Sequence, residues 1–364
     1  NSSQQGPGSA NKDADFDFRL DEFANYNQQS NYIYPNQNLA VFTENIFYLL
    51  PKLSLTPGIR FEFIETEAFG SFKRINTDAA GNVILNRTVP TSEVRRRDFA
   101  LFGLGVGYKP NLNLEFYGNV SQNYRSVTFT DISIVNPAYS INPNISDEKG
   151  FTSDMGVRGN IKKSFSFDAN LFRLFYSNRI GFIQKRGTDG SVKTERGNVG
   201  DAILYGLESL LDFNVKEITS IKNENFLLNY FVNFSYIKSE YITSLTPGVT
   251  GKKVEFVPEV NFKTGIKVAY QNYSFNVQYS YLSEQFSDSS NATSGNLSGV
   301  IGLIPAYDIL DVSSAFSKGK FRFELGINNL LNEVYFTRRA TGYPGPGIIP
   351  SPNRNFYITA QFKL

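Results

Sequence analysis

The last nine residues of the chain, 356–364, read FYITAQFKL and decide the fold. Every second side chain in this stretch is apolar, namely Phe356, Ile358, Ala360, Phe362 and Leu364. The positions between them hold Tyr357, Thr359, Gln361 and Lys363. An alternation of period two predicts a β-strand with one apolar and one polar face. The segment that begins at Phe321 alternates in the same way, so the chain is expected to end in two such strands joined by a long Gly/Pro-rich loop.

The same alternation recurs along the whole chain, in segments separated by short and long connections in turn. The expected strands are 38–50, 53–64, 99–108, 114–124, 151–161, 165–183, 202–213, 226–242, 254–270, 273–286, 307–316, 321–335 and 356–364. Soluble sandwiches have strands of about five or six residues. Strands of outer-membrane barrels need roughly 9–11 residues to cross the membrane, and they alternate short periplasmic turns with long extracellular loops. The pattern therefore predicts an all-β protein, a transmembrane antiparallel β-barrel.

The expected strands divide the chain into two parts. Residues 1–36 are polar and are expected to form a loop or the remnant of a strand, and residues 37–364 to form the barrel portion. Within the barrel portion, the longest polar stretch is 65–97, which is expected to be an extracellular loop.

The amino-acid composition argues against several classes of function. The 364 residues carry a net charge of +2, which gives no reason to expect a nucleic-acid partner. The chain contains neither Cys nor His, so Ser-His and Cys-His catalysis and HExxH zinc sites are excluded. We therefore expect no enzyme, no cofactor and no metal site. Aromatic residues make up 15% of the chain, which is typical of strands whose rings lie in a membrane interface.

Several stretches resemble TonB-dependent outer-membrane receptors. Residues 327–336, INNLLNEVYF, resemble the N-N-L-(F/L)-(D/N)-x-x-Y segment that lies on the penultimate strand of those proteins. Residues 55–62, LTPGIRFE, resemble the family's L-x-P-G-(I/L)-R-(Y/F)-E strand. Residues 337–350 and 354–357 resemble the ferric-dicitrate-receptor-like branch of the family.

The resemblance implies a barrel of about 22 strands that is filled by an N-terminal plug. The 13 strands expected here would be its last 13, and nothing in this sequence resembles a plug or a TonB box. We therefore expect the plug and about nine further strands in a part of the protein outside this sequence. Through that part, the receptor would contact the TonB–ExbB–ExbD system of the inner membrane.

The resemblance also orders the candidate functions. Energised import of a ferric chelate, citrate-like or another siderophore, comes first. A receptor of the same family for a glycan, a peptide or cobalamin comes second, and a passive porin or structural barrel comes third. The protein is expected in the outer membrane of a Gram-negative bacterium, in contact with lipopolysaccharide. In the resembled family, the barrel assembly machinery recognises the terminal strand.

Inward-facing arginines are the candidate ligand-binding residues. Strand parity points four of them into the lumen: Arg60, Arg125, Arg158 and Arg338. Arg125 and Arg338 lie at extracellular strand ends, and we expect them to bind an anionic chelate together with Arg339 and Tyr343, because arginine pairs bidentately with carboxylates. In the alternative interpretation, the inward arginines balance lumen carboxylates, for which Glu62 and Glu115 are the candidates, or contact the plug.

Further arginines and tyrosines are candidates for the membrane rim. Loop arginines expected to meet lipopolysaccharide phosphates are Arg95, Arg96, Arg97, Arg186, Arg196 and Arg339. Candidates for the aromatic girdle are Tyr48, Tyr108, Tyr117, Tyr124, Tyr236, Tyr270, Tyr279 and Tyr281. Arg173 would face lipid on the simplest count, so a bulge is expected in the strand that begins at Phe165.

Overall fold

The computed structural model describes residues 2–5, 30–78, 80–128, 131, 139–186, 192–296, 299–340 and 347–363. Most of them lie in one antiparallel sheet, in which each strand pairs with the next one along the chain. After the first position, the sheet consists of β5 (Leu53–Thr77), β6 (Val83–Asn111), β7 (Leu114–Arg125), β9 (Glu148–Ile161), β10 (Phe165–Arg186), β11 (Val192–Asn214), β12 (Phe226–Thr243), β13 (Val260–Tyr270), β14 (Tyr273–Leu282), β17 (Tyr307–Lys318), β18 (Phe321–Asn328) and β21 (Asn355–Phe362).

The first position of the sheet is an interrupted edge strand. Its pieces are β2 (Ser30–Ile33), β3 (Asn36–Glu44) and β4 (Phe47–Leu50). All three pair with β5, so together they act as one strand. With this strand, the pairings of the described residues give thirteen positions in chain order, and the expected all-β antiparallel sheet is confirmed.

Short strands lie outside this main order. β1 (Ser2–Gln5) pairs with β2, and β8 (Tyr139–Ile141) pairs in parallel with β11. Two small separate sheets consist of β15 (Gln285–Phe286) with β16 (Leu303–Ile304), and of β19 (Phe336–Ala340) with β20 (Gly347–Pro350). β1 and β2 thus fall within the stretch 1–36, which the sequence marked as a polar loop or strand remnant.

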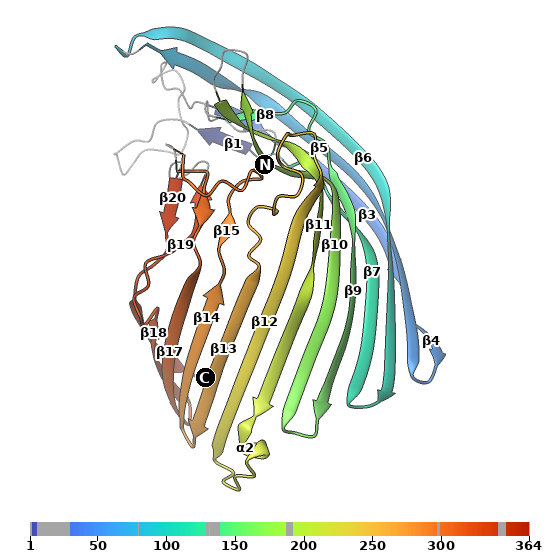
Figure 1. The fold of residues 1–364 in the computed structure, drawn as a ribbon, viewed down its shortest axis with the longest axis vertical. Helices are drawn as coiled ribbons and strands as arrows, with labels where there is room; N and C mark the ends of the chain where they lie inside the picture. Colours follow the sequence, from blue (N-terminus) through green and yellow to red (C-terminus); the bar gives the residue numbers. More distant parts are fainter. Residues whose placement is uncertain are drawn as a thin grey trace.

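Figure 1 shows the sheet as a curved wall with different connections at its two ends. The short turns lie together at one end, as does α2 (Val215–Ile218), which joins β11 to β12. The long connections and the arching β5–β6 hairpin lie at the opposite end. This separation is the one expected for periplasmic turns and extracellular loops.

The two faces of the sheet differ in chemistry. On one face, the apolar residues of β18 and β21 stand opposite each other, as in the pair Leu325 and Ile358, and both side chains are more than half exposed. On the other face, polar side chains bond to each other across strands. Tyr357 donates to Glu324 over 3.0 Å, and Tyr117 donates to Asp168 over 2.6 Å. The exposed apolar face therefore suits lipid, and the hydrogen-bonded polar face suits a lumen.

The bulge in β10 lies further along the strand than expected. β10 keeps an unbroken register with β11 from Phe165 to Tyr176, and its irregularity lies between Tyr176 and Arg179. Arg173 comes before this irregularity and stands opposite Tyr205 on the outward face. The expectation that a bulge turns Arg173 away from lipid is wrong.

The stretch 65–97 is a hairpin and not a loop. β5 and β6 stay paired as far as Thr77 and Val83, well beyond the apolar alternation. Cross-strand contacts support this extension, including an ion pair of 2.9 Å between Arg96 and Glu65. In water neither face of a strand needs apolar residues, so the alternation that marks a membrane strand ends before the strand does.

β18 ends earlier than the sequence predicts. The segment 329–335, expected on this strand, forms a turn in which Asn329 and Asn332 adopt positive φ values of 54° and 59°. Asn tolerates this left-handed conformation better than most residues. The side chain of buried Asn329 also bonds to both the N–H and the C=O of Glu333, at 2.8 Å each. The N-N-L-L-N run therefore closes a turn above the strand.

Two small apolar clusters fasten the extracellular segments to the strands. One consists of Val199, Ala202, Tyr241, Val249 and Val254. The other consists of Val127, Ile145 and Ile180. Both clusters lie where long connections cross the extracellular ends of the strands. They therefore hold this end of the sheet, called the rim below, in place. Among the described residues, no helix is long and apolar enough to cross a membrane.

The assignment of the two faces predicts the effect of charge on β21. Ile358 lies mid-strand on the outward face, and Thr359 lies on the inward face opposite Glu324. We expect Ile358→Lys to cost about 2–4 kcal/mol if the site is near the bilayer midplane. Thr359→Lys places a cation beside the carboxylate of Glu324, so we expect almost no change in stability. Outer-membrane yield and heat-modifiable gel mobility of the two variants measure the difference, and equal yields would show that the faces are assigned the wrong way round.

Candidate functional site

A pocket of about 450 Å³ opens at the extracellular ends of β7, β9, β10 and β11. Its lining includes three arginines, Arg125, Arg179 and Arg196, and two carboxylates, Glu148 and Glu255. The lining thus has one cation more than it has carboxylates, and the buried Asp131 behind it brings the charges of the site into balance. The other lining residues are Asn123, Tyr124, Tyr176, Ile180, Phe182 and Phe256.

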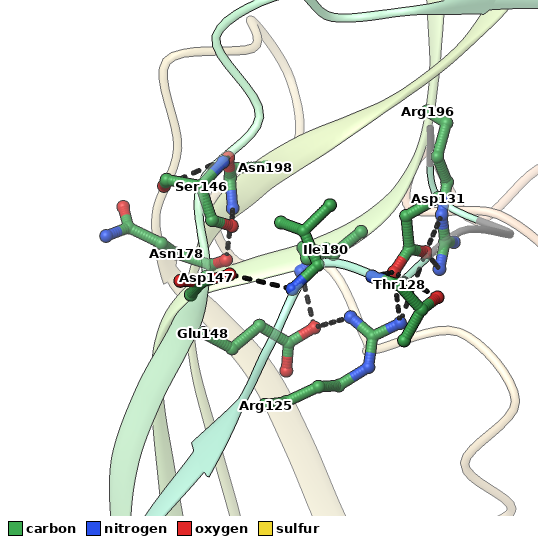
Figure 2. Close-up of polar contacts among 11 residues, drawn as sticks. Arg125, Thr128, Asp131, Ser146, Asp147, Glu148, Asn178, Ile180, Arg196 and Asn198 are labelled. Atoms are coloured by element: carbon green, nitrogen blue, oxygen red, sulfur yellow. Dashed lines mark hydrogen bonds and ion pairs between the residues drawn. The ribbon is translucent and has the colours of Figure 1, made fainter. Parts of the chain in front are cut away.

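Asp131 holds two of the arginines side by side. Its Oδ1 accepts hydrogen bonds from Nε and Nη2 of Arg196, at 3.0 and 2.7 Å. Arg125 Nη2 lies 3.1 Å from Asp131 Oδ2, which also accepts from the N–H and the hydroxyl of Thr128. The carboxylate is only 1% exposed. Figure 2 shows it between the two guanidinium groups, which it orients in the way that buried charge-assisted hydrogen bonds do.

Glu148 connects Arg125 to β10. One oxygen of this buried carboxylate accepts from Arg125 Nη1 and from the backbone N–H of Ile180, both at 2.8 Å (Figure 2). The backbone N–H of Ile180 is free to make this bond because the ladder with β11 is irregular just before it. The bulge in β10 therefore helps to fix Arg125, because it leaves the N–H of Ile180 available to Glu148.

The bulge also aims Arg179 into the pocket. Asn178 adopts a φ of 57°, and its carbonyl accepts from Asn198 Nδ2, which also bonds to the carbonyl of Ser146 over 2.8 Å. Tyr176 and Arg179 both line the pocket although they are three residues apart. A regular strand would point them to opposite faces, so the bulge is what brings Arg179 inside.

A second pocket of about 410 Å³ shares Phe182 and Phe256 with the first. The guanidinium of Arg196 lies 4.6 Å from the ring centre of Phe182, within the range of a cation–π contact. The second pocket is also lined by Arg338, Arg339 and Asp288, among others. The two aromatic residues therefore form a common wall between two arginine-lined hollows.

The arginines predicted to bind ligand divide between these pockets. Arg125 lines the first, and Arg338, which is exposed, lines the second. Arg339 also lines the second, where it donates to the carbonyls of Gly299 at 2.7 Å and Leu303 at 2.8 Å. These bonds tie the loops of the rim together. Tyr343 lies outside the described residues.

The arginines predicted to face the lumen or plug lie away from these two pockets and are paired with acids. Arg60 forms an ion pair with Glu62, and Arg158 donates to Glu115 over 2.9 Å near the short turns. Lys109 adds a second cation beside Glu115 at 3.6 Å.

Most loop arginines expected at lipopolysaccharide have internal partners instead. Arg95 donates to the carbonyl of Ile145 over 3.0 Å, and Arg97 pairs with Asp147 over 2.7 Å. Arg96 is 77% exposed and pairs with Glu65, while the side chain of Arg186 lies outside the described part of the chain.

One girdle tyrosine is placed differently, because Tyr117 faces inward and donates to Asp168. Tyr124 stands opposite Lys149 on the outward face, and its hydroxyl donates to Asp147.

The residues missed by sequence reasoning are Arg179, Phe182, Phe256, Glu148 and Asp131. The local signal for Arg179 was weak, because its direction depends on a bulge. Within the described ranges, no group of three or more His, Cys, Asp or Glu side chains could hold a metal ion.

The family follows from comparison with known proteins. Residues 2–330 match the family model "TonB dependent receptor-like, beta-barrel", and the chain belongs to this family. It is therefore an outer-membrane protein and a receptor barrel, not an enzyme.

Solved structures with the same fold include several metal-uptake proteins. The ferric-catecholate import receptor Fiu from E. coli K12 matches with 16% identity and a TM-score of 0.67, over 92% of this chain and 45% of that one. The ferric citrate transporter FecA matches with 17% identity and 0.67, over 92% and 55%. The copper transporter OprC matches with 13% identity and 0.65, over 92% and 52%. This chain thus spans about half the length of these relatives.

The ion pairs of the rim predict a dependence on pH. Burial alone would raise the pKa of Asp131, but bonds from Thr128 and Arg196 outweigh burial and lower this pKa below its usual value. Burial would also raise the pKa of Asp147, but hydrogen bonds from Arg97 and Tyr124 outweigh burial and lower this pKa. A carboxylate with a depressed pKa stabilises the fold at pH above its unfolded pKa of about 3.9, and this stability is lost as pH falls through the folded pKa.

We therefore expect the rim around residues 125–128 and 145–148 to lose protection below about pH 4. Hydrogen exchange, corrected for the intrinsic rate, measures this at pH 7 and pH 3. β14 contains no Asp or Glu and serves as the internal control. Rim peptides that stay as protected at pH 3 as those of β14 would contradict the role given to the two aspartates.

Proposed function

We propose that this chain is part of a receptor that imports a ferric chelate across the outer membrane with energy supplied through TonB. The observation that carries the proposal is the pocket with Arg125, Arg179 and Arg196 at the extracellular rim. A ligand arriving from outside meets this pocket before it reaches the lumen. Family membership supports the transport class, and the pocket supports an anionic ligand.

The chemistry of the pocket favours carboxylate or other oxyanion groups. Asp131 and Glu148 fix the arginines before a ligand arrives, so little side-chain entropy is lost on binding. Each guanidinium has five N–H donors, more than its acidic partners use here. The shared wall of Phe182 and Phe256 offers apolar area to the body of a chelate. A citrate-like ligand, as in the branch that residues 337–350 and 354–357 resemble, fits these features.

The same fold also serves a different metal, as the copper transporter OprC illustrates. A receptor of this family for a substrate other than a ferric chelate is therefore the second candidate. The two candidates differ in the effect of iron on ligand affinity. The ligand of the second candidate would bind equally well without iron.

The test is equilibrium binding by titration calorimetry on the whole receptor, with ferric citrate and a ferric catecholate as probes. We expect Arg196→Gln to weaken binding by about tenfold to a hundredfold, since a hydrogen bond to a charged group contributes roughly 1.5–3 kcal/mol. Arg158→Gln removes an arginine from the lumen far from the pocket and is the matched control. Arg125→Lys keeps the charge but loses the planar fork, so it should be intermediate.

Uptake of the radiolabelled chelate in cells with and without TonB completes the test. Loss of uptake without TonB, together with weak binding only in the pocket variants, supports the proposal. Binding that is equal in Arg196→Gln and Arg158→Gln would rule out the pocket as the ligand site. Binding that is independent of iron would favour the second candidate.

A further inference from the structure

The outward face of β9 to β12 is largely apolar, but its middle carries two neighbouring cations. Arg173 and Lys238 are both exposed there. The neighbours two residues before and after Arg173 are Leu171 and Phe175, as expected for a face in lipid. Met155 and Leu207, on the strands beside β10, are exposed on the same face. Arg173 and Lys238 are therefore exceptions that need an explanation.

The register places the two cations in one row. Arg173 stands opposite Tyr205, and Tyr205 stands opposite Lys238 on the next strand. Directly opposed residues of a sheet share a face, and neighbouring strands lie about 4.8 Å apart, so the two backbones are roughly 10 Å from each other. Both side chains are long and flexible, so their charged ends can approach one group above Tyr205.

Neither of the two cations is held by an ion pair in the described part of the chain. Among the described residues, neither Arg173 nor Lys238 forms an ion pair, whereas exposed Arg96 on the β5–β6 hairpin pairs with Glu65. The carboxylate closest in sequence on this face is Glu240, which stands opposite Ile203 further toward the extracellular end. Lys149, opposite Ser177, adds a third cation on that side.

The row lies at the depth of the outer interface. Arg173 is nine residues beyond the short turn that ends at Ser164, and a tilted strand crosses the membrane in roughly 9–11 residues. Tyr205 is 44% exposed between the cations, and exposed tyrosines on the lipid face are typical of the interfacial girdle. Long cationic side chains at this depth extend toward the headgroups.

We propose that Arg173 and Lys238, with Tyr205 between them, bind the phosphate of a lipid headgroup in the outer leaflet. The occupant follows from charge and position: the site is cationic, faces the membrane and lies at headgroup depth. Arginine supplies planar paired donors to phosphate oxygens, lysine supplies a point charge, and the tyrosine hydroxyl can donate a third bond.

Thermal unfolding of the whole receptor in detergent tests this, with bis-phosphorylated lipid A as the probe. We expect lipid A to raise the melting temperature of the wild type and of Arg173→Lys, and to leave the double variant Arg173→Gln/Lys238→Gln unchanged. The matched control is Lys263→Gln/Lys267→Gln, which removes two cations from the opposite face of β13 and should respond like the wild type. Arg173→Lys keeps the test informative if the double variant folds poorly.

Three results would overturn the proposal. The first is a response of the double variant equal to that of the wild type. The second is an equal rise with dephosphorylated lipid A or with inorganic phosphate, which would indicate apolar binding or a site for a soluble anion. The third is a dimer that forms without lipid and is lost in the double variant, which would assign the row to contact between two copies.

Discussion

The structure depends on the backbone hydrogen bond in a medium without water. Each unpaired N–H or C=O in the hydrocarbon region costs several kcal/mol, so a chain that crosses as strands must pair every strand with a neighbour. Among the described residues, the eleven inner positions from β5 to β18 have a neighbour on both sides, and β3 and β21 have one on a single side. The side chains then have only two environments. Residues such as Ile358 face lipid, and residues such as Tyr357 find partners across the lumen face.

The extracellular rim follows a different rule, because water is present there. Strands β5 and β6 continue without an apolar face, and polar pairs such as Arg96 with Glu65 replace the alternation. Buried carboxylates organise the site above the membrane. Asp131 and Glu148 each hold Arg125, and the bulge near Asn178 frees the N–H of Ile180 that completes the arrangement. A buried carboxylate of this kind is favourable only when all its bonds are made, and here two strand ends and a loop supply them.

The sequence predicted those features that repeat and missed those that occur once. The alternation gave the strands, the short turns and the faces of β18 and β21, because lipid imposes the same requirement on every strand. The alternation of short and long connections placed Arg125 at the extracellular end of its strand, and parity pointed it inward. Arg179 was not found, since its direction depends on a bulge that no residue type announces. The turn at Asn329 was missed for a related reason: the N-N-L-L-N run was assigned to a strand by resemblance, while its two asparagines in positive φ close a turn.

Single-cysteine labelling can measure whether the sheet has one face in lipid and one in the lumen. The chain contains no native Cys, so a nitroxide can be attached at one position at a time along residues 275–280 of β14. In the whole receptor in lipid vesicles, we predict the most frequent collisions with oxygen at Phe275, Val277 and Tyr279. Collisions with a water-soluble nickel complex should peak at Asn276, Gln278 and Ser280. A profile with no alternation, or with the two sets exchanged, would show that the sheet does not have these two faces.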